Sequence, residues 1–132
     1  MDFYRRAYYA QIAYSSYMDG VPMTVVETHR FLTDVKPLLS DSERADLVAF
    51  LGANPEAGQI IPETGGVRKL RWGLAGRGKR GGARVIYYFH SHLLPVFLLA
   101  AYAKNEKSNL TKAERNAMKE LVPLIAAGYG KK

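Results

Sequence analysis

The sequence contains no cysteine and only three histidines. The missing thiols exclude disulfide bonds, thiolate zinc sites and a cysteine nucleophile, and they are compatible with a reducing, cytoplasmic setting. No apolar run reaches the roughly 20 residues of a membrane-spanning helix, and Arg5 and Arg6 precede no apolar segment of the kind found in secretory signals. His90 and His92 have no acidic neighbour in the sequence, so we expect neither a metal site nor a cofactor.

Acidic residues are absent from the middle of the chain, between Glu63 and Glu106. This stretch holds eight of the 19 basic residues, namely Arg68, Lys69, Arg71, Arg77, Lys79, Arg80, Arg84 and Lys104. The remaining 11 basic residues face 12 acidic ones, so the net charge of +7 arises in this one stretch. Such local charge favours a polyanionic partner. A face that serves solubility alone is the alternative, but such faces usually mix both signs.

The first half of the chain predicts one short strand and two helices. The β-branched run at 23–27 is typical of a strand. Thr28 is placed to cap a helix that extends to about residue 35. Ser40 and Glu43 match the capping-box pattern, which predicts a second helix as far as about residue 51. The residues of this helix expected to face the core are Leu47, Val48 and Leu51.

The second half alternates with a period of two, which predicts strands at 67–72 and 83–89 around a glycine-rich basic loop at 73–82. The run at 95–102 is almost wholly apolar and predicts a strand covered on both faces. Thr111 and Glu114 form a second capping box, which opens a helix that we expect Gly128 to end. The residues expected to be buried in this helix are Ala117, Met118, Leu121, Val122 and Ile125.

This order of elements predicts an α+β fold. Consecutive strands joined by short turns pair antiparallel, and the helices then pack on one side of the sheet, with a C-terminal helix closing the chain. At 132 residues, a single domain is expected, and no internal repeat is present.

The glycine-rich loop contains two phosphate-binding patterns that we reject. Residues 73–79 match GxxxxGK, but Arg80 stands where a magnesium-binding Ser or Thr belongs, and residues 76–81 match GxGxxG. Both motifs need a following helix, whose N-terminal amides hold the phosphate, and here a strand follows. A hairpin loop is the better interpretation. Arg77, Lys79 and Arg80 on that loop, together with Arg68, are expected to contribute to RNA binding.

The strand cations carry the clearest functional signal. Lys69 and Arg71 point to one side of a strand, and Arg84 shares a face of the next strand with Tyr88. Guanidinium groups pair phosphates bidentately and tyrosine stacks on unpaired bases, so the set suits an RNA site. An ordinary solvated sheet face is the alternative, and it accounts for Lys69 better than for the whole set.

Four segments together resemble the HigB-like branch of the RelE toxins. They are LGANPEAG at 51–58, IPETGGVRKLR at 61–71, GRGKRGGARVIYY at 76–88 and YAKNE at 102–106. The resemblance extends over about 23–121, and it implies a small RelE-like toxin domain at 23–127, followed by a tail at 128–132. Residues 1–22 have no counterpart in it, so we expect a dispensable N-terminal extension, with Met18 and Met23 as possible alternative starts.

The resemblance implies a type II toxin that cleaves messenger RNA in the ribosomal decoding site without a metal. In this family the 2′-hydroxyl of a ribonucleotide attacks the adjacent phosphate, and basic side chains stabilise the transition state. The strand cations of the family match Lys69, Arg71 and Arg84, and Lys104 matches a basic residue after the last strand. The general base stays open between Tyr88 and Lys69.

Two departures from the better-known RelE proteins keep other functions open. Asn105 stands where a further Arg is expected, and Thr111 stands where a Tyr is expected. A ParE-like relative that inhibits DNA gyrase is one alternative, and a non-catalytic protein that binds RNA or the ribosome is another. The toxin hypothesis also requires an antitoxin, which we expect to be a DNA-binding protein encoded by the neighbouring gene. We expect no membrane partner.

Overall fold

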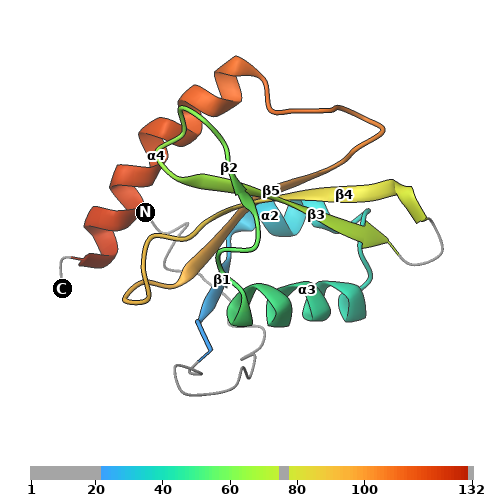
Figure 1. Ribbon diagram of the computed structural model, residues 1–132, viewed down its shortest axis with the longest axis horizontal. Coiled ribbons are helices and arrows are strands. Elements are labelled where there is room, and N and C mark those ends of the chain that lie inside the picture. Colours follow the sequence, from blue (N-terminus) through green and yellow to red (C-terminus); the bar gives the residue numbers. More distant parts are fainter. Residues whose placement is uncertain (1–21, 75–77, 131–132) are drawn as a thin grey trace.

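The computed structural model describes residues 22–74 and 78–130, with backbone alone for 74, 78–81 and 129–130. Three helices and five strands occupy these residues (Figure 1). In chain order they are β1 (Val25–Glu27), α2 (His29–Val35), α3 (Asp41–Ala53), β2 (Gln59–Ile60), β3 (Val67–Leu74), β4 (Gly78–Tyr88), β5 (Val96–Ala103) and α4 (Lys112–Gly130). The α+β class predicted from the sequence is confirmed.

The five strands form one sheet in the order β1-β5-β4-β3-β2. The pairs formed by β2, β3, β4 and β5 are antiparallel, as the short connections predict. In contrast, β1 pairs in parallel with β5, and Val26 lies opposite Phe97. The first strand reaches β5 only after two helices and three strands have intervened, so no short turn fixes its direction.

The prediction that the helices pack on one side of the sheet was wrong, because helices cover both faces. Figure 1 shows α3 and α4 on opposite sides. Phe31 of α2 and Leu47 and Leu51 of α3 pack with one set of strand side chains. Met118 and Val122 of α4 pack with the other set. The almost wholly apolar β5 lies between the two layers of helices, and its residues from Val96 to Tyr102 are buried, as its sequence predicts.

The predicted helix caps are present. Ser40 Oγ accepts from the amide of Glu43 at 3.1 Å, and the Glu43 carboxylate accepts from the amide of Ser40 at 2.8 Å. Thr111 and Glu114 make the same reciprocal pair at the start of α4. Thr28 Oγ1 accepts from the amide of Phe31 at the start of α2. These local signals succeeded because each one involves groups only three residues apart.

The end of α4 and one of its predicted core positions were wrong. The helix continues through Gly128 to Gly130, and Ala117 is exposed, whereas Met118, Val122 and Ile125 are buried. Gly128 tolerates a helical backbone as well as a helix end, so its presence alone does not stop a helix whose inner face is packed.

The predicted glycine loop is shorter than expected. The ladder of β3 reaches Leu74 and that of β4 begins at Gly78, with a register shift between Trp72 and Leu74. A two-residue strand, β2, was not predicted, and its Gln59 lies opposite Lys69 of β3. Residues 1–21 of the predicted extension and residues 131–132 of the predicted tail lie outside the described residues. Within the part of the chain described, no helix has the length and apolarity to cross a bilayer.

Candidate nucleic-acid interface

Three neighbouring strands bring side chains into one row near the tip of the β3–β4 hairpin. Arg71 of β3 lies opposite Arg84 of β4, and Arg84 lies opposite Tyr102 of β5. Directly paired residues of an antiparallel sheet share a face, so the three side chains are neighbours. Lys69, two residues before Arg71, shares this face and lies opposite Ile86. Because Ile86 packs in the layer that α4 covers, the row lies on the α4 side of the sheet.

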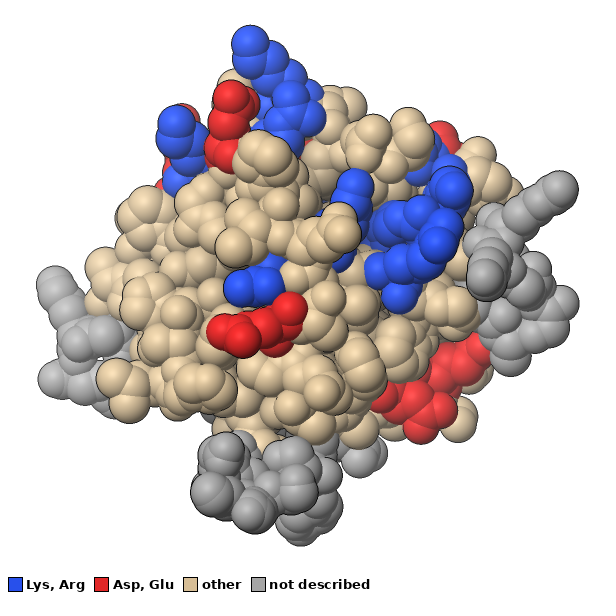
Figure 2. Space-filling model, in the orientation of Figure 1, with Lys and Arg blue, Asp and Glu red and all other residues tan. Residues whose placement is uncertain are grey.

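A hollow of about 440 Å³ lies beside this row. Its lining residues are Ala57, Gln59, Lys69, Leu70, Arg71 and Arg84. Three of the six are cations and none is a carboxylate. Figure 2, in the same orientation as Figure 1, shows basic side chains gathered where β3 and β4 lie. We call this hollow the cationic pocket, and its chemistry suits an anion.

Arg84 is the most constrained cation in the pocket. Its side chain is half-buried, and its Nη1 atom is shielded from solvent with no hydrogen-bond partner among the described residues. Buried polar groups in folded proteins are nearly always paired, and an unpaired buried charge is destabilising. An anion seated in the pocket would supply the missing acceptor. Because no described residue pairs with this nitrogen, the unliganded pocket carries a cost in stability that a bound anion would relieve.

Tyr102 lies next to Arg84 and is held by the segment that leads into α4. Burial raises the pKa of the Tyr102 phenol, while the positive charge of Arg84 lowers it. The Lys107 ammonium lies 5.0 Å from the centre of the Tyr102 ring, and the phenol donates to the carbonyl of Ser108 at 3.5 Å. The phenol therefore stays protonated at neutral pH and serves as a donor and a packing surface.

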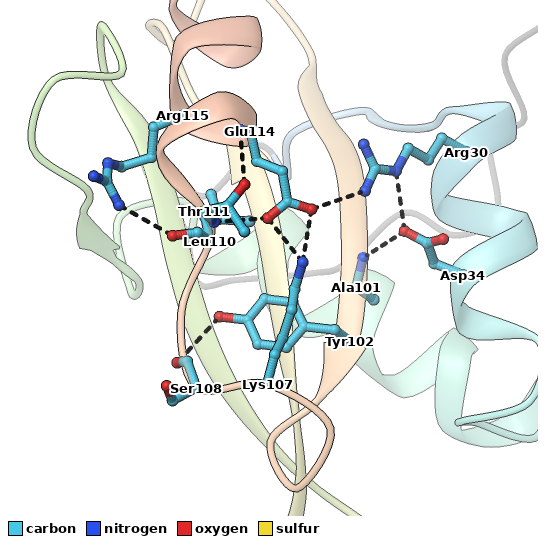
Figure 3. Close-up of polar contacts among 10 residues, drawn as sticks. All are labelled: Arg30, Asp34, Ala101, Tyr102, Lys107, Ser108, Leu110, Thr111, Glu114 and Arg115. Atoms are coloured by element: carbon cyan, nitrogen blue, oxygen red, sulfur yellow. Dashed lines mark hydrogen bonds and ion pairs between the residues drawn. The ribbon is translucent and has the colours of Figure 1, made fainter.

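Glu114 fixes this segment in place (Figure 3). Lys107 Nζ donates to Glu114 Oε1 at 2.8 Å and to Oε2 at 2.6 Å. Arg30 of α2 lies 3.9 Å from the same carboxylate, and its Nε donates to Asp34 at 3.3 Å. Asp34 in turn accepts from the amide of Ala101 in β5 at 3.1 Å. This chain of contacts ties α4, α2 and β5 together.

Lys69 and Lys104 extend the positive surface from opposite sides of the row. Lys69 Nζ donates to Asn109 Oδ1 at 3.0 Å, so the lysine bridges β3 and the segment before α4. Lys104 is exposed, and its amide donates to the carbonyl of Gly82 at 3.1 Å, which places its backbone beside the first half of β4.

Other predicted site residues do not join this group. Arg68 alternates to the opposite face, and its Nη1 donates to the carbonyls of Glu56 and Gly58 at 3.1 and 2.8 Å. Tyr88 is 4% exposed within the layer under α4, and burial raises its pKa. Arg77 lies outside the described residues, and for Lys79 and Arg80 only the backbone of β4 is described.

Sequence reasoning missed three residues of this region. Tyr102 was within reach of prediction, because it is two residues before Lys104 and alternates to the same face as the neighbouring strand cations. Gln59 lines the pocket because β2 pairs with β3, which no sequence signal indicated. Asn109 reaches Lys69 across 40 positions of the chain, so only the folded arrangement reveals it.

The arrangement can bind and stabilise a phosphate. Two guanidinium groups and an ammonium border one hollow, and guanidinium groups bind phosphate oxygens bidentately. Such groups also stabilise negative charge that develops during phosphoryl transfer, without reorganising when the reaction occurs. Within the described residues, no group of three or more His, Cys, Asp or Glu side chains is placed to hold a metal ion.

One comparison with known proteins bears on this site. Residues 53–130 match the model of a family described as the RelE toxin of the RelE/RelB toxin–antitoxin system. The match covers more than half of the chain and contains β2, β3, β4, β5 and α4, and hence every lining residue of the cationic pocket.

Proposed function

Because the chain belongs to the RelE toxin family of toxin–antitoxin systems, we propose that it cleaves messenger RNA on the ribosome without a metal. The observation that carries the proposal is the convergence of Lys69, Arg71 and Arg84 on one pocket, where the buried Nη1 of Arg84 has no acceptor among the described residues. A phosphodiester of the RNA supplies the acceptor that this nitrogen needs.

In the proposed reaction the 2′-hydroxyl of one nucleotide attacks the phosphorus of its own 3′-phosphate. The hydroxyl gives up its proton to a water molecule as the O2′–P bond forms, and the P–O5′ bond breaks. The leaving 5′-oxygen takes up a proton, so the products are a 2′,3′-cyclic phosphate and a 5′-hydroxyl. Arg84 and Arg71 hold the non-bridging oxygens, whose negative charge grows in the transition state.

In this proposal the Lys69 ammonium gives the proton that the leaving 5′-oxygen takes up, and Lys104 assists in binding. Tyr88 is buried in the layer under α4, and burial raises its pKa, which disfavours a tyrosine base. Lys69 lines the cationic pocket with Arg71 and Arg84. Its contact with Asn109 holds the ammonium on the rim of the pocket.

A toxin of this family is kept with an antitoxin, and charge suggests how the two associate. The stretch from Thr64 to Asn105 carries basic residues and no acidic ones, so an acidic segment of the antitoxin is attracted to it. Association should therefore slow as salt rises beyond about 0.15 M, where the screening length is ~8 Å. We expect the neighbouring gene to encode this partner, with a DNA-binding part and an acidic or amphipathic part.

Primer-extension mapping of transcripts after induced expression tests the cleavage proposal. Cuts phased with codons, present in translated messages and absent from the same messages with a blocked start codon, are the expected result. Intact transcripts with broken chromosomal DNA would instead indicate a gyrase inhibitor. Intact transcripts with unbroken DNA would indicate a non-catalytic binder.

Co-expression with the neighbouring gene tests the antitoxin. The expected outcome is rescue of growth and co-purification of the two proteins. A chain that is harmless alone and purifies without the neighbour would remove the support for a toxin.

A further inference from the structure

A second hollow of about 440 Å³ adjoins the cationic pocket and has a different chemistry. It lies between β2, the turn after β2 and the segment that enters α4. Gln59 and Lys69 line both hollows, and they are paired across β2 and β3, so they form the ridge between them. Whatever enters one hollow therefore lies directly beside the contents of the other.

Apolar and polar groups both line the second hollow, and we call the polar groups its rim. Ile61, Pro62 and Leu110 supply apolar surface, and Leu110 is buried. Asn109 and the residues Glu63 and Arg115 supply polar groups. A flat ring with polar edges is the kind of ligand that such a hollow fits, because the ring covers the apolar surface and the edges meet the rim.

Glu63 distinguishes this hollow from the cationic pocket. A carboxylate repels phosphate but accepts hydrogen bonds from the N–H groups of a base. Glu63 has a φ of +64°, the only positive φ of a non-glycine residue in the part of the chain described. This backbone conformation is unfavourable for an L-residue, and such conformations cluster at binding sites.

The donors of the rim complement the carboxylate. Asn109 Oδ1 accepts from Lys69 Nζ at 3.0 Å, so the amide nitrogen is left to donate. Arg115 Nη1 donates to the carbonyl of Leu110 at 3.0 Å, which holds the guanidinium at the rim. A ligand should therefore offer adjacent N–H donors to Glu63 and oxygen or nitrogen acceptors to Asn109 or Arg115.

We propose that the second hollow binds the base of a nucleotide next to the cleaved phosphate and prefers guanine. Guanine presents two N–H donors, at N1 and N2, which a carboxylate accepts together, and it presents acceptors at O6 and N7. Adenine has no N1–H, and neither pyrimidine offers the same pair of donors beside an acceptor edge. This inference rests on the proposed function, since it makes the hollow the specificity subsite of the same RNA site.

Binding of the four ribonucleoside monophosphates to the purified chain tests the inference without requiring catalysis. In two-dimensional NMR titrations, GMP should shift the amide signals of residues 60–63 and 109–110 and should bind roughly tenfold more tightly than AMP, CMP or UMP. Glu63→Gln keeps the shape and the backbone preference but accepts poorly from two N–H groups, so this variant should bind the four nucleotides about equally. Glu120→Gln, which changes an exposed carboxylate of α4 outside the hollow, should retain the preference for GMP.

Arg84→Ala separates the two hollows. This variant should lower the affinity for all four nucleotides by a similar factor, because they share the phosphate. The order of the four affinities should stay unchanged. Equal binding of the four nucleotides to the wild-type chain, or GMP shifts that fall elsewhere, would overturn the inference. Specific GMP binding without cleavage of translated messages would instead refute the proposed function and leave the base pocket standing. Cleavage without any preference for guanine beside the cut would refute the base pocket and leave the proposed function standing.

Discussion

Replacing Arg84 with Ala should separate catalysis from stability. The Nη1 atom of Arg84 is buried without a hydrogen-bond partner among the described residues, so the side chain contributes an uncompensated charge to the unliganded fold. Removing it should change the free energy of unfolding by no more than about 1 kcal/mol, because the lost packing of its stem offsets the relieved charge. A structural arginine with paired nitrogens would instead lose several kcal/mol on truncation.

The effect on cleavage should be much larger. If Arg84 holds a non-bridging oxygen in the transition state, losing that contact costs roughly 3–4 kcal/mol, or ~100- to 1000-fold in rate. Single-turnover cleavage of a message bound to programmed ribosomes measures the rate, and urea unfolding of the same preparation measures the stability. Lys119→Ala, at an exposed position of α4, is the matched control and should leave both quantities unchanged.

Two outcomes would refute this reasoning. A variant that cleaves at the wild-type rate would show that Arg84 does not contact the reacting phosphate. A loss of several kcal/mol in stability would show that Arg84 has a structural partner and that its inactivity follows from unfolding.

Three further predictions concern the stability of the fold. Glu27 is 1% exposed, and burial raises the pKa of its carboxyl, while Arg44, 3.1 Å away, lowers it. Because the net shift is upward, ionisation of Glu27 opposes folding. The stability that this group contributes therefore falls as pH rises from its pKa in the unfolded chain through its higher pKa in the folded protein. Glu27→Gln should flatten the fall in stability that urea titrations measure as pH rises above about 4, and an unchanged slope would contradict the assignment. The Tyr87 phenol accepts from the amide of Gly58 and donates to the carbonyl of Pro55, both at 2.8 Å. Tyr87→Phe should therefore lower the free energy of unfolding, measured in a thermal or urea melt, by about 1–3 kcal/mol. An unchanged free energy of unfolding would show that water replaces the phenol. A chain that starts at Met23 should melt cooperatively and keep its toxicity, because Met23 is buried and its amide donates to the carbonyl of Gly52 at 2.9 Å. Loss of the cooperative unfolding transition would show that the preceding residues belong to the core.

The prediction that Arg68 binds RNA differs from the position of its side chain in the structure. Lys69 and Arg71 alternate with Arg68 along β3, so only one of the two faces could carry the cationic pocket. The sequence made Arg68 an RNA contact by its charge alone. The structure instead commits its guanidinium to two carbonyls of the segment that leads into β2, where it supports the strand that supplies Gln59.

What the sequence determined by itself is local or periodic. The capping boxes at Ser40 and Thr111, the helices that they open and the alternation of β3 depend on groups only a few residues apart, so neighbouring residues suffice to specify them. The concentration of positive charge between Glu63 and Glu106 is likewise a property of the sequence, and it indicated a polyanionic partner before any fold was known.

The tertiary structure decided what depends on pairing across long stretches of chain. The parallel docking of β1 on β5, the position of α4 on the second face and the two-residue β2 each arise from contacts between distant segments. The same pairing brings Tyr102 beside Arg84 and Asn109 to Lys69. Such contacts form because distant segments together bury apolar surface on both faces of β5. No short stretch of sequence contains all of the segments that contribute to this burial.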